Sequence, residues 1–414
     1  MLPSEIRCVV GIDIAKAAHM VCALDAPDGR IRQRPRRIPA TAEGHAQLLA
    51  WLGDWGAAAT VLIGLEATGP LWEPLYDALT AAGYTVLVLN PRQTASWASS
   101  LGLRAKTDAL DAQTLALGLL AGLARASTLP SEAIQALRAL TRTRRDFVEE
   151  RTAARQRLHD ELVVLFPEFV RLVARWPGTT DLGAPAVLGL LSTHPSARAV
   201  ALAEPGALVA LVGEASAGRW GVAEATALAA AAAHSVAGTR AVVARGLVVR
   251  TLALHLLELQ QRVAELEAAI ADLLRDDADG QRLQTIPGIG PQLAATIRAE
   301  LGDVTRFQGV DQVIAYAGLD PRTRQSGAFV GQKRLSKRGP GALRHALYLA
   351  AFVATRARPE WQARYQRLLD RGRGAKEARV ILSRALLKVV YHLLRTGETY
   401  DPASIKPLPS TAGA

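Results

Sequence analysis

The stretch Val9-Val10-Gly11-Ile12-Asp13-Ile14-Ala15-Lys16 is an apolar run that contains a single carboxylate. Valine and isoleucine favour a strand, and a strand that is apolar on both faces belongs in the middle of a sheet. Because side chains alternate along a strand, Asp13 points to the opposite face from Ile12 and Ile14. A charge beside a core strand costs free energy unless it is paired or binds a metal ion. Taken alone, Asp13 reads as a cap at the strand end, but three later carboxylates favour a metal site.

The first 125 residues alternate strand and helix patterns in an order that predicts an α/β domain of the RNase H-like type. Three strands are followed by helix, strand, helix, strand and helix. The expected strands are residues 8–14, 18–24, 30–38, 60–65 and 84–89, and the expected helices are residues 41–55, 71–82 and 93–123. The third strand carries five arginines. It is therefore expected to be exposed, either as a solvated face or as a track for a phosphate backbone.

Three further carboxylates are expected to lie near Asp13. Glu66 ends the fourth strand, which neighbours the first strand in this topology, and Asp108 and Asp111 share one face of the last helix because they are three residues apart. Four carboxylates repel one another without cations, and their hard oxygen ligands suit Mg²⁺ or Mn²⁺. We predict a catalytic site with two such ions, about 3.5–4 Å apart, that acts on phosphodiesters. The alternative for any one of these residues is an exposed charge or a helix cap.

The composition indicates a globular protein with a polyanionic partner. The chain has 414 residues, 50% hydrophobic and 21% charged, with a net charge of +11. Nucleic acid is the most common partner of such a basic protein. No apolar run is long enough to span a bilayer and no signal peptide is visible. The two cysteines, Cys8 and Cys22, fit a reducing compartment, so a cytoplasmic location is expected and a zinc module is not.

The middle of the chain, residues 127–279, is expected to be a helical, coiled-coil linker and assembly region. Residues 131–166 form a long helix in which arginines alternate with acidic residues, and residues 167–240 show no recognisable function. A heptad seam follows and predicts pairing, either with residues 131–166 as a hairpin or with another subunit, so that the protein is a dimer or tetramer. The seam residues are Val249, Leu252, Leu256, Leu259, Val263, Leu266, Ile270 and Leu273.

Residues 280–398 are expected to form an all-α domain that binds nucleic acid, followed by a disordered tail, residues 399–414. The run Ile286-Pro287-Gly288-Ile289-Gly290 resembles a helix-hairpin-helix turn, whose glycines let backbone N–H groups approach a phosphate. Between Pro321 and Pro359 there are nine Lys or Arg residues and no acidic residue, which is typical of a phosphate clamp. The predicted nucleic-acid contacts are Gly288, Gly290, Arg322, Arg324, Lys333, Arg334, Lys337 and Arg338.

Several motifs carry a family resemblance. GIDIAK, GLEATG and KTDALDA resemble the RuvC-like half of the DEDD-type insertion-sequence transposases. TIPGIGPQLAATIRAELGD, AYAGLDP, RQSG and RLSKRGPGALRHALY resemble that family's C-terminal transposase domain. The resemblance covers residues 6–125 and 280–395. It implies a prokaryotic, nucleoid-associated enzyme that cuts and rejoins donor and target DNA for an insertion sequence.

The resemblance also implies roles for particular residues. Asp13, Glu66, Asp108 and Asp111 match the family's four acidic residues, and Ser326 best matches a serine that becomes covalently joined to DNA. On the residues alone, Ser326-Gly327 is a simple turn, and Ser336 competes for the role because it too lies among basic residues. The family implies guidance by a structured (bridge) RNA as well.

Three other functions use some of the same features. A junction-resolving nuclease would use the four carboxylates with water as the nucleophile, and a covalent protein–DNA adduct would exclude it. A non-enzymatic nucleic-acid-binding protein would keep the charge and the glycine turn without needing four acids. An actin-like sugar kinase also begins with a GID-type strand, but it needs glycine-rich phosphate loops in both halves, which the sequence lacks.

Overall fold

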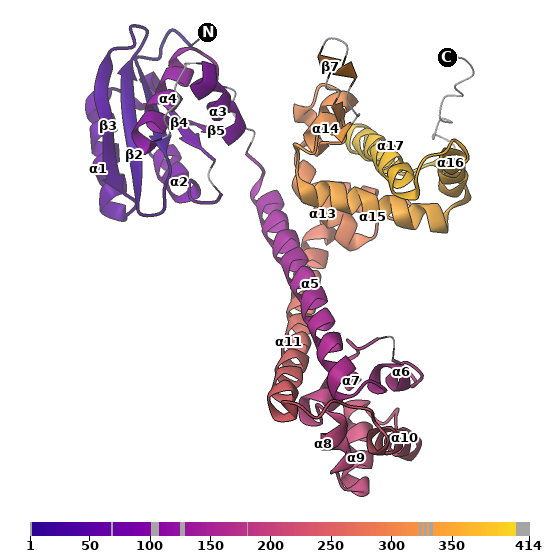
Figure 1. Ribbon diagram of the computed structural model, residues 1–414. Helices are drawn as coiled ribbons and strands as arrows, with labels where there is room; N and C mark the ends of the chain where they lie inside the picture. Colours follow the sequence, from indigo (N-terminus) through magenta and orange to yellow (C-terminus); the bar gives the residue numbers. More distant parts are fainter. Residues whose placement is uncertain are drawn as a thin grey trace. The chain divides into compact units, whose positions relative to one another are not determined.

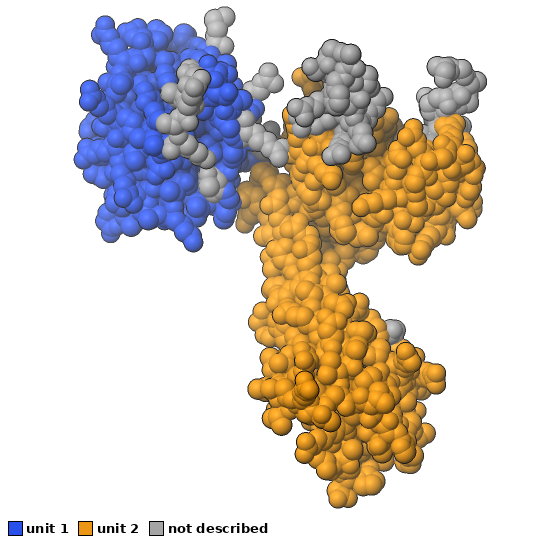
Figure 2. All heavy atoms as spheres, viewed as in Figure 1, with its two compact units in different colours: residues 1–129 blue, residues 130–414 orange. Residues whose placement is uncertain are grey.

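The computed structural model divides into two compact units, residues 1–129 and residues 130–414 (Figure 2). It describes residues 2–67, 69–100, 107–124, 129–179, 181–322, 325–326, 329–330 and 334–402, without the side chains of Arg92 and of residues 322–334. The predicted division at residues 126, 279 and 398 stays a prediction, and most of the predicted tail lies outside the described residues.

The first unit contains a five-stranded mixed sheet with the order β3-β2-β1-β4-β5 (Figure 1). Strands β1, β2 and β3 are antiparallel neighbours, and β4 and β5 run parallel to β1. The strands are β1 (Cys8–Asp13), β2 (Ala18–Asp25), β3 (Ile31–Pro39), β4 (Val61–Glu66) and β5 (Thr85–Leu89). This order confirms the predicted RNase H-like fold.

Helices cover both faces of this sheet. Val10, Ile12 and their even-numbered neighbours in β1 pack with Leu48 of one helix and Leu75 of another. Val9, on the other face, packs in a second cluster with the last helix of the unit. The helices are α1 (Ala42–Trp55), the 3-10 turn η1 (Ala58–Thr60), α2 (Glu73–Ala81), α3 (Pro91–Ser100) and α4 (Asp108–Leu120). The helix predicted over residues 93–123 is therefore two helices, and residues 101–106 lie outside the described part of the chain.

The second unit begins with a long helical hairpin. Helix α5 (Glu132–Leu165) packs against α11 (Val242–Arg275) along most of its length (Figure 1). The pairs Arg144–Glu267 and Glu161–Arg245 show that the two helices are antiparallel. Val249, Leu256, Leu259, Val263 and Ile270 of the predicted seam are buried in α11. This confirms the intramolecular hairpin, whereas pairing with another subunit stays a prediction.

The predicted seam is wrong at its end. Leu273 is exposed and Leu274 is buried in its place, while Leu252 and Leu266 are only partly buried. A strict heptad repeat advances by 3.5 residues per turn, and a nearly straight α-helix advances by 3.6. Over seven turns this difference rotates the buried stripe away from the heptad positions, so the last seam residue falls on the solvent side.

Residues 166–241 form a small helical subdomain at the closed end of this hairpin. Phe166, Phe169 and Trp220 are buried in its core, together with the adjoining ends of α5 and α11. Its helices are α6 (Phe169–Val173), α7 (Pro185–Thr193), α8 (Ala197–Ala201), α9 (Pro205–Ala215) and α10 (Val222–Ala233).

The C-terminal part of the second unit is a helical domain around Trp361, which is fully buried. Its helices are α12 (Ala278–Gln284), α13 (Pro291–Leu301), η2 (Val304–Arg306), α14 (Val310–Ala317), α15 (Gly341–Ala357), α16 (Pro359–Asp370) and α17 (Ala375–Thr396). The loop predicted over residues 318–341, and with it the all-α prediction, needs one correction. It contains two short antiparallel pairs, β6 (Pro321–Arg322) with β9 (Arg334–Leu335) and β7 (Gln325–Ser326) with β8 (Phe329–Val330).

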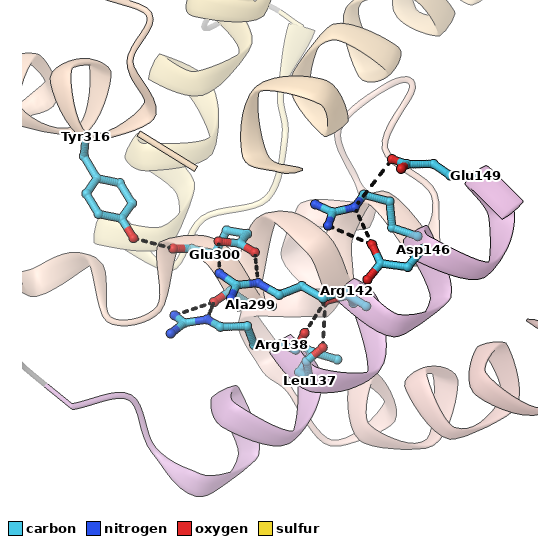
Figure 3. Close-up of polar contacts among 10 residues, drawn as sticks. Leu137, Arg138, Arg142, Asp146, Glu149, Ala299, Glu300 and Tyr316 are labelled. Carbon is cyan, nitrogen blue, oxygen red and sulfur yellow. Dashed lines mark hydrogen bonds and ion pairs between the residues drawn. The ribbon is translucent and has the colours of Figure 1, made fainter. Parts of the chain in front are cut away.

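Two arginines of α5 join the hairpin to this domain (Figure 3). Arg138 donates from Nε and Nη2 to the carbonyl oxygen of Ala299, at 3.0 and 2.8 Å. Arg142 makes a two-pronged ion pair with the buried carboxylate of Glu300, at 2.8 and 3.1 Å, and this contact raises the pKa of Arg142. Tyr316 donates to the carbonyl oxygen of Glu300. The basic face of α5 is therefore partly structural.

Candidate active site

The side chains of Asp13 and Glu66 project from the same face of the sheet, at the edge where strands β1 and β4 end. Strands β1 and β4 are parallel, and Ile12 pairs with Leu65, so Asp13 and Glu66 follow at the next position of the register. Val9 and Leu62 pack in the cluster that contains α4, and two-residue alternation places Asp13 and Glu66 on that same face. Both side chains are half-buried. The sequence-based expectation that these two carboxylates are neighbours is consistent with this geometry.

Helix α4 crosses this face with its first turn toward the same edge. A Cβ atom added at Gly11 would lie 2.2 Å from the carbonyl oxygen of Ala112, so the helix backbone rests on β1 there. At the other end of the helix, Leu120 approaches Gly29, in the turn that follows β2. That turn lies beside the start of β1, because Cys8 pairs with Asp25. The first turn of α4 therefore lies toward the end of β1 that carries Asp13.

That first turn carries the two remaining predicted carboxylates, Asp108 and Asp111. Thr107 caps the helix, and its Oγ1 accepts a hydrogen bond from the amide of Leu110 at 3.3 Å. The positive end of the helix dipole stabilises negative charge at this position. The helix thus carries two carboxylates in its first turn, toward the end of the sheet where Asp13 and Glu66 lie.

Glu66 has a hydrogen-bond partner that sequence reasoning missed. Thr94 Oγ1, in α3, donates to Glu66 Oε2 at 2.7 Å, and Thr94 is buried. The bond orients the carboxylate without neutralising it. A threonine after the Asn90-Pro91 break was the only sequence signal for this contact.

The structure brings the four acids to one edge without gathering them into a complete ligand group. Over the part of the chain that the structure describes, no three His, Cys, Asp or Glu side chains lie together closely enough to hold a metal ion. The donor set is nevertheless all carboxylate oxygen, which is the chemistry that Mg²⁺ and Mn²⁺ prefer. Asp13, Glu66, Asp108 and Asp111 are therefore the residues that could hold such ions.

The two candidate nucleophiles have different backbone settings. Ser326 ends the short strand β7 and pairs with Phe329 of β8, while its side chain lies outside the described part of the chain. The hydroxyl of Ser336 donates to the carboxylate of Asp320, and its amide donates to the Asp320 carbonyl oxygen at 2.9 Å. Ser336 is thus held by the segment that follows α14.

The basic segment Lys337–Gly339 is fixed against the end of α14. A Cβ atom at Gly339 would lie 1.6 Å from the Tyr316 carbonyl oxygen, and one at Gly318 would lie 2.8 Å from the Arg338 amide. Lys337 has φ 51°, a left-handed conformation that costs free energy in a residue other than glycine. The exposed side chains of Lys337 and Arg338 therefore extend from a constrained turn. The other predicted basic contacts, Arg322, Arg324, Lys333 and Arg334, have side chains outside the described residues.

Gly288 and Gly290 differ from each other. Gly288 has φ +85° and its α-carbon faces α15, where a Cβ atom would lie 2.4 Å from the Ala350 carbonyl oxygen. Its lack of a side chain is thus explained by turn geometry and by packing. Gly290 caps α13 and faces open space. Of the two predicted phosphate contacts, Gly290 is the one whose surroundings leave room for a ligand.

Two family models and several known proteins match this chain. Residues 10–167 match a family model described as a transposase, and residues 280–366 match the model of the transposase IS116/IS110/IS902 family. The mini-circle putative transposase for IS117 of Streptomyces coelicolor is 29% identical, over 97% of each chain. A probable family 20 transposase of Pseudomonas aeruginosa is 27% identical, over 95% of this chain and 98% of its own. A pilin gene-inverting protein of Moraxella bovis is 32% identical over 29% of this chain and 38% of its own.

The fold and these matches define the class of the protein as a transposase with an RNase H-like domain. The chain belongs to the IS110/IS116 transposase family. Transposases act on DNA, so the predicted DNA partner stands. Among the described residues, no helix is long and apolar enough to cross a membrane.

Proposed function

We propose that this transposase cuts and rejoins DNA with metal ions held by its four acids and with Ser326 as the nucleophile, under the guidance of a structured RNA. The observation that carries the proposal is the placement of Asp13 and Glu66 at one edge and on one face of the sheet, the edge toward which the first turn of α4 is directed. Few arrangements other than cation binding explain four carboxylates at one edge of a sheet.

The four acids have distinct tasks in this proposal. Asp13 and Glu66 are fixed by their strands, and Thr94 holds the Glu66 carboxylate in one orientation. Asp108 and Asp111 close the ligand group through rotation of their side chains, which cation binding favours because it offsets their mutual repulsion. When bound, Mg²⁺ or Mn²⁺ supplies stabilisation of the charge that develops on the reacting phosphate.

Ser326 supplies what the acids lack, a nucleophile that conserves the phosphodiester bond energy. Its Oγ attacks a DNA phosphorus atom, the bond from phosphorus to one deoxyribose oxygen breaks, and that oxygen leaves with a proton as a hydroxyl. A hydroxyl of a second DNA end then attacks the phosphoserine, restores a phosphodiester and releases Ser326. The basic residues around Ser326 favour a bound phosphate.

The family resemblance supports guidance by RNA and assembly into a dimer or tetramer, and the net charge of +11 supports a polyanionic partner such as RNA. Purification without nuclease treatment, followed by sequencing of bound RNA, tests the guide. A protein that recombines donor and target DNA after complete removal of RNA would contradict this part of the proposal.

The central experiment separates the metal site from the nucleophile. Asp13→Asn and Asp111→Asn should fold and bind DNA but cut none, and a chelator should have the same effect on the wild type. Ser326→Ala should lose the covalent DNA adduct, whereas Ser336→Ala, its matched control, should keep it. Cutting by Ser326→Ala without any adduct would instead indicate the water-using nuclease. An adduct that maps to Ser336 would move the nucleophile there.

A further inference from the structure

Arg37, in the outermost strand β3, lies in the same cross-strand row of the sheet as Asp13. The register pairs Asp13 of β1 with Met20 of β2, and Met20 in turn pairs with Arg37 of β3. Residues paired across neighbouring strands point to the same face of a sheet. Arg37 therefore leaves the sheet on the α4 face, two strand spacings or about 10 Å from Asp13.

The neighbouring residue supports this assignment of faces. The guanidinium of Arg36 lies 4.4 Å from the ring centre of Trp51, in α1, and Arg36 pairs with Val21, which packs in the cluster on the α1 face. Since consecutive residues of a strand alternate, Arg37 points to the opposite face, the one that carries Asp13 and Glu66. The Arg37 side chain is exposed and makes no hydrogen bond or ion pair with any residue that the structure describes.

We propose that Arg37 binds a backbone phosphate of the DNA strand that is cut at the acidic edge, the end of the sheet where Asp13, Glu66, Asp108 and Asp111 lie. An edge made of four carboxylates repels a polyanion, and a cation beside it offsets that repulsion. Arginine suits this task because its planar guanidinium can donate two parallel hydrogen bonds to one phosphate. Arg37 is thus a positioning residue: it holds the DNA strand beside the four acids, on the side of the site that is nearer to β3. The inference rests on the proposed function, in that the acidic edge is where DNA is cut.

A purely protective role for the charge is the main alternative, because cations on an edge strand discourage pairing with another sheet. Arg30, which directly precedes the first residue of β3, would discourage pairing with another sheet as well as Arg37 does. It is also exposed, and the described residues include no side-chain partner for it. Arg30 lies beside Asp25, however, at the end of the sheet away from Asp13. It is therefore the matched control.

The first measurement is DNA affinity as a function of salt, made on the full chain with a fluorescent DNA duplex in the presence of a chelator. Arg37→Gln should lower the slope of log affinity against log salt by about one unit, because one phosphate contact is lost. Arg37→Lys should retain most of the slope, and Arg30→Gln should match the wild type. Equal slopes for Arg37→Gln and Arg30→Gln would overturn the proposal.

The second measurement locates the contact. Both native cysteines are buried, and burial raises the pKa of each thiol to about 11, so they leave a low background for thiol chemistry. DNA that carries a thiol tether on a backbone phosphate should form a disulfide with Arg37→Cys and much less with Arg30→Cys. Similar yields at both positions would show a general edge charge and reject the specific contact. Neither measurement needs metal or cutting, so loss of cutting in Asp13→Asn remains a separate test of the proposed function.

Discussion

Gly11 leaves no room for a side chain between β1 and α4. An added Cβ atom would lie 2.2 Å from the Ala112 carbonyl oxygen and 2.4 Å from the Ala116 amide nitrogen, and both are backbone atoms of a packed helix. A glycine inside a central strand is a known sign of such a close approach. The apolar pattern of residues 9–16 predicts the strand, and the glycine within it is the sequence signal for the close approach of α4.

Gly11→Ala should therefore push α4 away from the sheet. We expect the free energy of unfolding of the first unit to fall by about 3 kcal/mol, the upper part of the range for overpacked cores. DNA cutting should fall as well, because Asp108 and Asp111 move with α4. Chemical denaturation and a cutting assay measure the two effects. Gly53→Ala is the control, since Gly53 lies in α1 with open space around it and should gain about 0.5–1 kcal/mol.

We expect His19 to make the stability of the first unit depend on pH. It is buried in β2, its ring stacks on His45 with centroids 5.8 Å apart, and its Nδ1 has no hydrogen-bond partner among the described residues. Burial, with a smaller effect of His45, lowers the pKa of His19 below its ordinary value. The unfolded chain, whose histidines titrate near about 6.5, thus binds more protons than the folded chain below that pH.

The stability of the first unit should accordingly fall as the pH is lowered from 7 toward 5. His19→Phe should flatten this dependence, because the substituted side chain does not titrate. His234→Asn, at an exposed position of the second unit, should leave it unchanged. Urea denaturation at several pH values measures it, and an equally steep pH dependence in His19→Phe would contradict the assignment.

At the scale of elements, the hairpin of α5 and α11 shows how far a periodic pattern carries. The pattern predicted two long helices, and both are present, because a long amphipathic run needs a partner to cover its apolar stripe. It left open whether that partner was α5 or another subunit, since any complementary helix satisfies the same pattern. The arginines of α5 were predicted only as an ion-paired surface. Their bonds to Ala299 and Glu300 join segments about 160 residues apart, which no local pattern encodes.

The burial of the seam leads to a prediction about folding. Leu259 is 1% exposed between α11 and α5, and Leu273 is 37% exposed. Leu259→Asp should destabilise the second unit by at least about 3 kcal/mol, because it removes apolar contacts and buries a charge. Leu273→Asp, an identical change, should alter stability by no more than about 0.5 kcal/mol. Equal losses in thermal denaturation would mean that the whole seam, Leu273 included, is covered in solution.

For the molecule as a whole, the sequence predicted the first unit better than the second. The strands that carry Asp13 and Glu66 are short apolar runs bounded by turns, and the order of elements limits their topology to very few choices. The four acids were predicted from their positions in that order and from the family resemblance, and their role stays a prediction. The segment around Ser336 was predicted as an open loop, because its turn depends on Gly318, Gly339 and Asp320. These contacts bring together residues that are distant in the sequence, and glycine spacing alone does not reveal them.

Each unit has its own buried core, and this determines how the whole chain should unfold. Cys8, Ile63 and Leu79 are fully buried in the first unit, and Leu256, Leu347 and Trp361 in the second. Calorimetry should therefore resolve two transitions that respond to different substitutions. Gly11→Ala should lower the midpoint of one transition alone, and Leu259→Asp that of the other. A single transition that both substitutions shift equally would show that the units unfold as one cooperative block, and the stability effects predicted above would then belong to the whole chain.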